Sequence, residues 1–159
     1  MLKRIAAGGV AAVVGLGVWG VAGEDHTTRD EAGTIVAGGQ LGAFATQVGD
    51  CFESLPSSVE GVSTIPAVPC SNQHHWQVYH KGSLNATEFN ESSIYNESDV
   101  VCMNFLESYI PSMPVEKYEI FKDAEFSTLI PTSASWEKGD RSVDCLIGSD
   151  IINYYESFI

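Results

Sequence analysis

The alternation of apolar and polar side chains predicts most of the strands of this chain. The segment 74–82 combines aromatic and β-branched residues and ends at Gly82, which is typical of a strand. Alternation divides this strand into two faces, one with His74, Trp76, Val78 and His80, the other with His75, Gln77 and Tyr79. Further strands are predicted at 126–130 and 142–147, and shorter extended stretches at 34–36, 48–52 and 64–70.

One amphipathic helix is predicted in the second half of the chain. Its apolar residues recur at helical spacing, at Val101, Cys102, Phe105, Leu106 and Tyr109. Ser98 suits the N-cap, and Pro111 disfavours further helix, so we place the helix at 98–109. A polar loop is expected before it, at 83–97, and the segment 115–121 fits either a short helix or a strand.

A short helical turn is predicted after Pro131, just before the last strand. Thr132 can cap this turn through its hydroxyl group, and Trp136 is its large apolar anchor. Gly139 stands where the chain leaving a helix often needs a positive φ. Asp140 and Arg141 follow at the corner, where they can pair with each other or hold loop carbonyl groups.

These elements predict an α+β fold with a small antiparallel sheet and one central packed helix. The chain of 159 residues is long enough for one domain with a leader and a linker. We expect the globular domain at 46–159, with the aromatic-rich tail 150–159 packing back on it. The polar, glycine-rich segment 24–45 is expected to be mainly a stalk.

The first 23 residues predict export through a membrane. Lys3 and Arg4 are followed by an uncharged apolar run that extends to Gly23. The small residues at 21–23 would allow cleavage of a signal peptide, whereas the length of the run and Trp19 favour a signal-anchor helix. Both alternatives place the positive end in the cytoplasm and the domain outside, with membrane contact only if the leader is retained.

The formal net charge of −13 limits the partners of the domain. Proteins that bind nucleic acid carry a basic patch, so we expect no nucleic-acid ligand for this acidic chain. Anionic lipid would repel the folded part. We interpret the acidity mainly as a source of solubility, and a surface for a divalent cation or a basic partner is the weaker alternative.

The four cysteines predict two disulfides. No two of them have the spacing of metal ligands, and an even number after an export leader is typical of bridges formed in an oxidising compartment. Sequence alone allows three connectivities. We favour Cys51–Cys70, which flanks a hairpin-sized segment, and Cys102–Cys145, which would tie the helix to the final strand.

No catalytic, cofactor-binding or metal-binding set is assigned from the sequence. His74 and His80 would lie about 20 Å apart on an extended strand, too far to share a metal ion. The chain has no Gly-x-Ser-x-Gly motif and no phosphate-binding glycine loop in a strand–helix context. Three sequons, at Asn85, Asn90 and Asn96, would accept glycans if the protein were secreted by a eukaryote.

Several separated pieces of the chain together resemble the septum formation family of actinobacterial envelope proteins. The pieces are Gly49-Asp50-Cys51-Phe52, Val68-Pro69-Cys70-Ser71 with His74, Cys102, Pro131-Thr132, Ser135-Trp136, Gly139-Asp140-Arg141 and Cys145-Leu146. The resemblance covers about residues 48–147. Members often have acidic residues at the positions that are His75 and Gln77 here, so the chain departs from the family pattern there.

The resemblance implies an envelope protein held at the extracytoplasmic face of the membrane or secreted. Its expected role is non-enzymatic, as an interaction module in septum formation or wall assembly with envelope or division proteins as partners. The motif residues would then be structural. The alternative is a hydrolase of wall glycan or peptide that uses surface carboxylates and His74.

Overall fold

The computed structural model describes residues 2–4, 26–55 and 62–159 and confirms an α+β fold with a central helix and two disulfides. The strands are β1 (Leu2–Arg4), β2 (Thr28–Arg29), β3 (Ile35–Ala37), β4 (Gly39–Gly42), β5 (Cys51–Phe52), β6 (Thr64–Val68), β7 (Trp76–Ser83), β8 (Glu125–Pro131) and β9 (Ser142–Gly148). The helices are α1 (Glu91–Tyr109), a 3₁₀ turn η1 (Ile110–Ser112), α2 (Val115–Phe121) and α3 (Ser133–Trp136).

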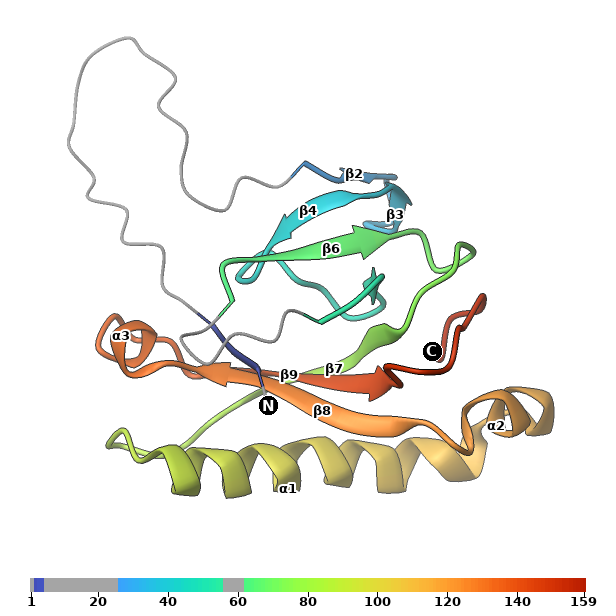
Figure 1. Ribbon diagram of the computed structural model, residues 1–159. Helices are drawn as coiled ribbons and strands as arrows, with labels where there is room; N and C mark the ends of the chain where they lie inside the picture. Colours follow the sequence, from blue (N-terminus) through green and yellow to red (C-terminus); the bar gives the residue numbers. More distant parts are fainter. Residues whose placement is uncertain (1, 5–25, 56–61) are drawn as a thin grey trace, which may run out of the picture.

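Seven strands form one sheet in the order β1-β8-β9-β7-β5-β6-β4, and β2 pairs with β3. The pairs within the large sheet are antiparallel except that of β1 with β8, which is parallel. Helix α1 lies along one face of β7, β9 and β8, and β6 and β4 lie over the opposite face (Figure 1). The sheet therefore curls over itself. Strand β9 lies between β8 and β7.

This curl produces two hydrophobic cores. The core beneath α1 includes Ile94, Cys102 and Leu106 from the helix and Val143, Cys145 and Ile147 from β9. The second core lies inside the curl and includes Leu41, Phe52, Ile65, Trp76, Val78, Leu129 and Leu146. Strand β9 has buried side chains on both faces, which explains why nearly all of it is buried.

The N-cap of helix α1 lies eight residues before the predicted cap. Asn90 is the N-cap, and its side chain accepts a hydrogen bond from the backbone N–H of Ser93. Ser98, the predicted cap, is a fully buried residue inside the helix and donates to the carbonyl of Ile94. The predicted loop at 83–97 is thus wrong in its second half, where the buried Ile94 and Ser98 extend the buried stripe by about two turns.

A bulge in β7 corrects the predicted faces of this strand. Val78 pairs with Leu146 and His80 with Cys145, so Tyr79 is the extra residue. Tyr79 and His80 consequently both face α1, where their rings lie 5.8 and 4.4 Å from that of Phe105. Trp76 and Val78 face the other core, and His74 lies outside the strand in an isolated bridge with Tyr154.

Much of the segment expected to be a stalk is folded. Strand β4 pairs with β6 from Gly39↔Ala67 to Gly42↔Thr64, and both Leu41 and Ile35 are buried. The glycines permit close backbone approach, since a Cβ on Gly38 would lie 2.7 Å from the carbonyl oxygen of Ala67. The structure therefore differs from the expectation of a stalk over 24–45.

The structure also answers what the sequence left open about the segment 115–121 and the C-terminal tail, but not about most of the leader. The segment 115–121 is helix α2, and the tail packs back through the buried Tyr154 and Phe158. Within the leader the structure describes only β1, so the prediction of a signal peptide or anchor helix at 1–23 lies largely outside the described residues. No helix in the described part of the chain is long and apolar enough to cross a membrane.

Candidate functional site

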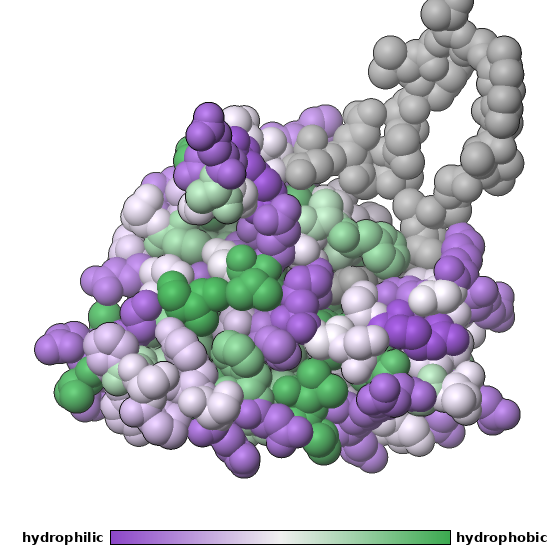
Figure 2. Space-filling model, turned by 180° about the vertical axis from the view of Figure 1, so that it is seen from behind, coloured by the Kyte–Doolittle hydropathy of each residue, from purple (hydrophilic) through white to green (hydrophobic). Residues whose placement is uncertain are grey.

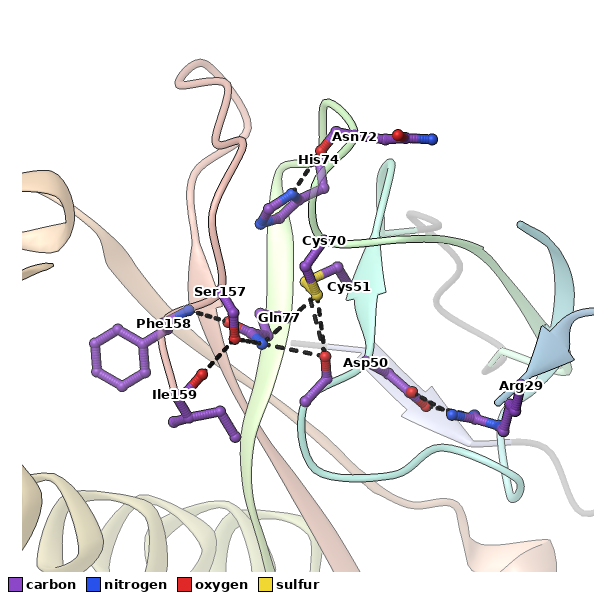
Figure 3. The surroundings of a disulfide bond; sticks show 11 residues. Arg29, Asp50, Cys51, Cys70, Asn72, His74, Gln77, Ser157, Phe158 and Ile159 are labelled. Carbon is purple, nitrogen blue, oxygen red and sulfur yellow. Dashed lines mark hydrogen bonds and ion pairs between the residues drawn. A yellow bond between two sulfur atoms is a disulfide. The ribbon is translucent and has the colours of Figure 1, made fainter. Parts of the chain in front are cut away.

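The Cys51–Cys70 disulfide is the centre of a polar corner where distant segments meet (Figure 3). Cys51 begins β5, and Cys70 follows β6 at a sequence separation of 19. Both expected bridges are present, the second joining Cys102 in α1 to Cys145 in β9. The corner also gathers Asp50 and His74, which the resemblance had singled out.

Gln77 connects this corner to the C-terminal tail. Its Nε2 donates to the carbonyl of Gly49 at 3.1 Å and to Ser157 Oγ at 2.8 Å, and its Oε1 accepts from the backbone N–H of Phe158 (Figure 3). A carboxylate here could accept from Phe158 but could not donate to a carbonyl group. The amide at Gln77 therefore fits this arrangement, in place of the acid common in the resembled pattern.

Asp50 forms a buried ion pair with Arg29. The guanidinium group of Arg29 donates to both carboxylate oxygens, at 2.6 and 2.8 Å, and Asp50 also accepts from the backbone N–H of Gln47. Asp50 is only 3% exposed. The two parallel hydrogen bonds fix the orientation of both side chains and compensate their charges. The ion pair therefore connects β2 to the residue that precedes β5.

His74 is 1% exposed and lies above the disulfide. Its Nδ1 is 3.0 Å from the carbonyl oxygen of Asn72, which can only accept, so Nδ1 carries the proton. Nε2 makes no hydrogen bond of good geometry among the described residues, although a backbone group of Glu156 lies close enough to the ring to raise the pKa of His74. Burial lowers the pKa of His74, while the carbonyl group of Asn72 acts in the opposite direction and more weakly.

The second group of motif residues forms a separate lock at α3. Thr132 and Ser135 make a reciprocal capping box, and Gly139 has a φ of +91°. The guanidinium group of Arg141 stacks 3.4 Å from the ring centre of Trp136, which is buried in the core. Arg141 also donates to the backbone carbonyls of Trp136 and Asp140.

Asp140 and Arg141 do not form the ion pair that was one of the two expected arrangements. Although the structure describes both residues, their side chains make no salt bridge; the Asp140 carboxylate instead accepts from the backbone N–H and Oγ of Ser142. Arg141 follows the other alternative, in which it holds loop carbonyls. The physical reason is that the Trp136 ring draws the guanidinium group away from its neighbour.

A buried polar cluster inside the curl was missed from the sequence. Lys81 Nζ lies 2.7 Å from Asp144 Oδ1 and donates to the hydroxyl and carbonyl oxygens of Thr46. Thr46 donates in turn to Asp144 Oδ2. The sequence feature that could have indicated this cluster is Asp144, the one acidic residue in an otherwise largely apolar strand. With Thr46 and Asp144 both buried, this network holds β7, β9 and the turn after β4 together.

A groove of about 350 Å³ lies between α1 and β8. Its lining includes Tyr95, Asp99, Met103, Phe126, Ser127 and Thr128. Tyr79 forms part of the wall and donates from its hydroxyl to the carbonyl of Cys102. Partial removal from water raises the pKa of Asp99, and burial followed by the nearby Asp99 charge raises that of Tyr79.

The described partners of the motif side chains are other parts of the fold. His74 is enclosed, and Asp50 accepts from the Arg29 guanidinium group. Asp140 accepts from Ser142 through Oδ1, and its Oδ2 is buried with no hydrogen-bond partner among the described residues. No group of three or more His, Cys, Asp or Glu side chains in the described part of the chain could hold a metal ion. The motif residues thus form two separate groups of contacts, which we call the two locks, and the α1–β8 groove is an open concave site within the described part of the chain.

Residues 17–146 match the family model described as septum formation. The chain belongs to the septum formation family. The matched region of this family member contains all four cysteines and extends upstream over β2, β3 and β4. It ends before the tail that Gln77 fastens. No curated protein and no solved structure matches the chain.

Proposed function

We propose that this protein is a non-enzymatic, extracytoplasmic envelope protein that acts as an interaction module in septum formation. The family match carries the link to septation. Two disulfides support an extracytoplasmic location, because bridges of this kind persist in oxidising compartments. The partners would be envelope or division proteins.

The use of the motif residues supports a binding role over a hydrolytic one. His74 would have to reach a polymeric wall substrate, yet it is enclosed by the tail and the loop after β6. Asp140 is engaged by Ser142 rather than poised beside a second acid. An active pair of carboxylates in a glycosidase must instead flank an accessible bond.

The surface supports selective contacts with other proteins. Hydrophobic residues form separate patches between hydrophilic ones on the face seen in Figure 2. A net charge of −13 favours basic partners and opposes adsorption to anionic lipid. Attachment to the membrane would then depend on the N-terminal segment.

The decisive experiment is the position of an export-competent fluorescent fusion in dividing actinobacterial cells. Enrichment at the septum is the expected result. An even distribution around the envelope would contradict a role in septation. A fusion carrying only residues 1–45 controls for targeting by the leader and the segment after it.

Turnover of wall material tests the non-enzymatic part of the proposal. Purified protein should release no more soluble glycan or peptide from isolated cell walls than the buffer does. Release that disappears in a His74→Asn or Asp140→Asn variant with an unchanged melting temperature would instead establish the hydrolase.

A further inference from the structure

The outer edge of β8 can accept a strand. In the structure β1 pairs with β8 in parallel register, from Leu2↔Leu129 to Arg4↔Pro131. No described strand pairs with this edge over 125–128. The edge therefore offers backbone donors and acceptors, and part of it already holds a short strand.

In the proposed exported protein, β1 cannot stay paired with this edge of β8. If the positive end of the leader stays in the cytoplasm, Leu2–Arg4 and β8 lie on opposite sides of the membrane; if the leader is cleaved, β1 is lost. In both cases the exported domain has an open β8 edge over its full length. A strand from another protein can then take the place of β1.

The groove beside this edge contains an unsatisfied polar group. Thr128 is 5% exposed and lines the groove, and its Oγ1 is buried with no hydrogen-bond partner among the described residues. A buried hydroxyl without a partner is costly, so a ligand that supplies one gains more than it would from an exposed hydroxyl. Tyr95, Met103 and Phe126 add apolar surface at the mouth, each more than 40% exposed.

Acidic groups give the groove a preference for positive charge. Asp99 lies on its wall, and Glu125 begins β8. A second hollow of about 340 Å³ continues from Tyr95 along α1 and is lined by Glu91, Ser92 and Asn96. The two hollows share Tyr95 and follow one another along α1, an arrangement that suits an extended chain better than a compact ligand.

We propose that the exported protein binds an extended basic peptide segment of a partner, added parallel to β8, with side chains in the α1–β8 groove. A basic side chain pairs with Asp99, and a polar group of the peptide meets Thr128 Oγ1. The strand supplies affinity through its backbone, and the groove supplies selectivity. This inference rests on the proposed function, because it names the chemistry of the partner.

Peptide binding to the full chain in phosphatidylcholine nanodiscs tests the proposal. The probe is a fluorescent synthetic peptide with the sequence of residues 2–7, Leu-Lys-Arg-Ile-Ala-Ala, followed by fluorescence anisotropy. We expect saturable binding. Asp99→Asn should weaken it about tenfold and Thr128→Val about fivefold, as expected for one charged and one neutral hydrogen bond.

Matched controls separate the groove from bulk charge. Glu107→Gln changes the same charge on an exposed part of α1 and should leave affinity unchanged. Thr128→Val should not lower the melting temperature, because it removes an unsatisfied buried hydroxyl. A peptide with alternate backbone nitrogens methylated should not bind, and one with Gln in place of Lys and Arg should bind weakly.

Several results would overturn the inference. They are no binding, equal binding to the Asp99→Asn variant, equal binding of the methylated peptide, and full competition by spermidine or free arginine. Failure of peptide binding with septal enrichment intact would refute this inference alone. Peptide binding without septal enrichment would refute the link to septation and leave the docking surface standing.

Discussion

His74 links the stability of the fold to pH at the scale of one residue. The folded protein holds the imidazole neutral, because burial lowers its pKa below the ordinary value of 6.5. The unfolded chain takes up a proton as the pH falls through 6.5, and the folded chain resists until lower pH. The contribution of His74 to the free energy of unfolding is therefore complete above pH 6.5 and declines as the pH falls below that value.

Thermal unfolding between pH 8 and pH 5 measures this linkage. The wild-type melting temperature should fall more steeply than that of His74→Asn, which keeps a donor near the Nδ1 position. Burial also lowers the pKa of His80, so His80→Asn is the matched control and should flatten the profile less, as His80 is less buried. Parallel profiles for wild type and His74→Asn would contradict the assignment.

Arg141 shows a single-residue contact that the sequence left open. Proximity in sequence made Asp140 an obvious partner, but a planar guanidinium group also stacks on aromatic rings, and Trp136 is five residues away. We expect Arg141→Lys to lower stability by about 1 kcal/mol, because Lys cannot both stack and hold two carbonyls. Denaturant unfolding measures this change, and a loss no larger than that of Lys138→Arg would contradict it.

The disulfides tie elements together, and their spans predict different contributions. In the chain-entropy model, closing loops of 19 and 43 residues contributes about 3 and about 4 kcal/mol to stability. Replacing Cys102 and Cys145 together by Ala should thus lower the free energy of unfolding more than replacing Cys51 and Cys70. Urea unfolding of both double variants tests the order, and a reversed order would contradict it.

The elements differ in how well the sequence predicted them. The strands β8 and β9 carry enough alternating apolar residues to be placed closely, and Cys102 and Cys145 were correctly paired. The start of α1 was missed because polar residues surround Ile94, so only tertiary burial distinguishes that turn from a loop. The bulge at Tyr79 has no local signal, since it depends on the register with β9.

The candidate site was predicted only in part for the same reason. Cysteines and a conspicuous Trp-x-x-Gly-Asp-Arg run identified the two locks. Asp99, Thr128 and Phe126 come from two elements that meet only through packing, so the groove has no sequence signature. The role of Gln77 has no local signal in the sequence, because its partners Ser157 and Phe158 lie about 80 residues further along the chain.

At the scale of the whole molecule, the N-terminal boundary of the fold decides what can be removed. A glycine-rich composition suggested that 24–45 connects rather than folds. Yet Ile35 and Leu41 are buried in the second core, and Arg29 neutralises the buried Asp50. The segment covers one edge of the sheet, so the domain begins well before residue 46.

Truncation at the two candidate boundaries tests this view. A chain starting at His26 should unfold cooperatively, whereas one starting at Thr46 should lack a cooperative transition. Losing two buried aliphatic side chains costs about 3–6 kcal/mol, and an unpaired buried Asp50 about 3–5 more. Together these losses are comparable to the 5–15 kcal/mol that is roughly the whole stability of a domain. Near-UV circular dichroism during heating measures both chains, with Arg29→Met in the longer chain isolating the ion pair. Equal melting temperatures for the two chains would mean that the segment is a stalk after all.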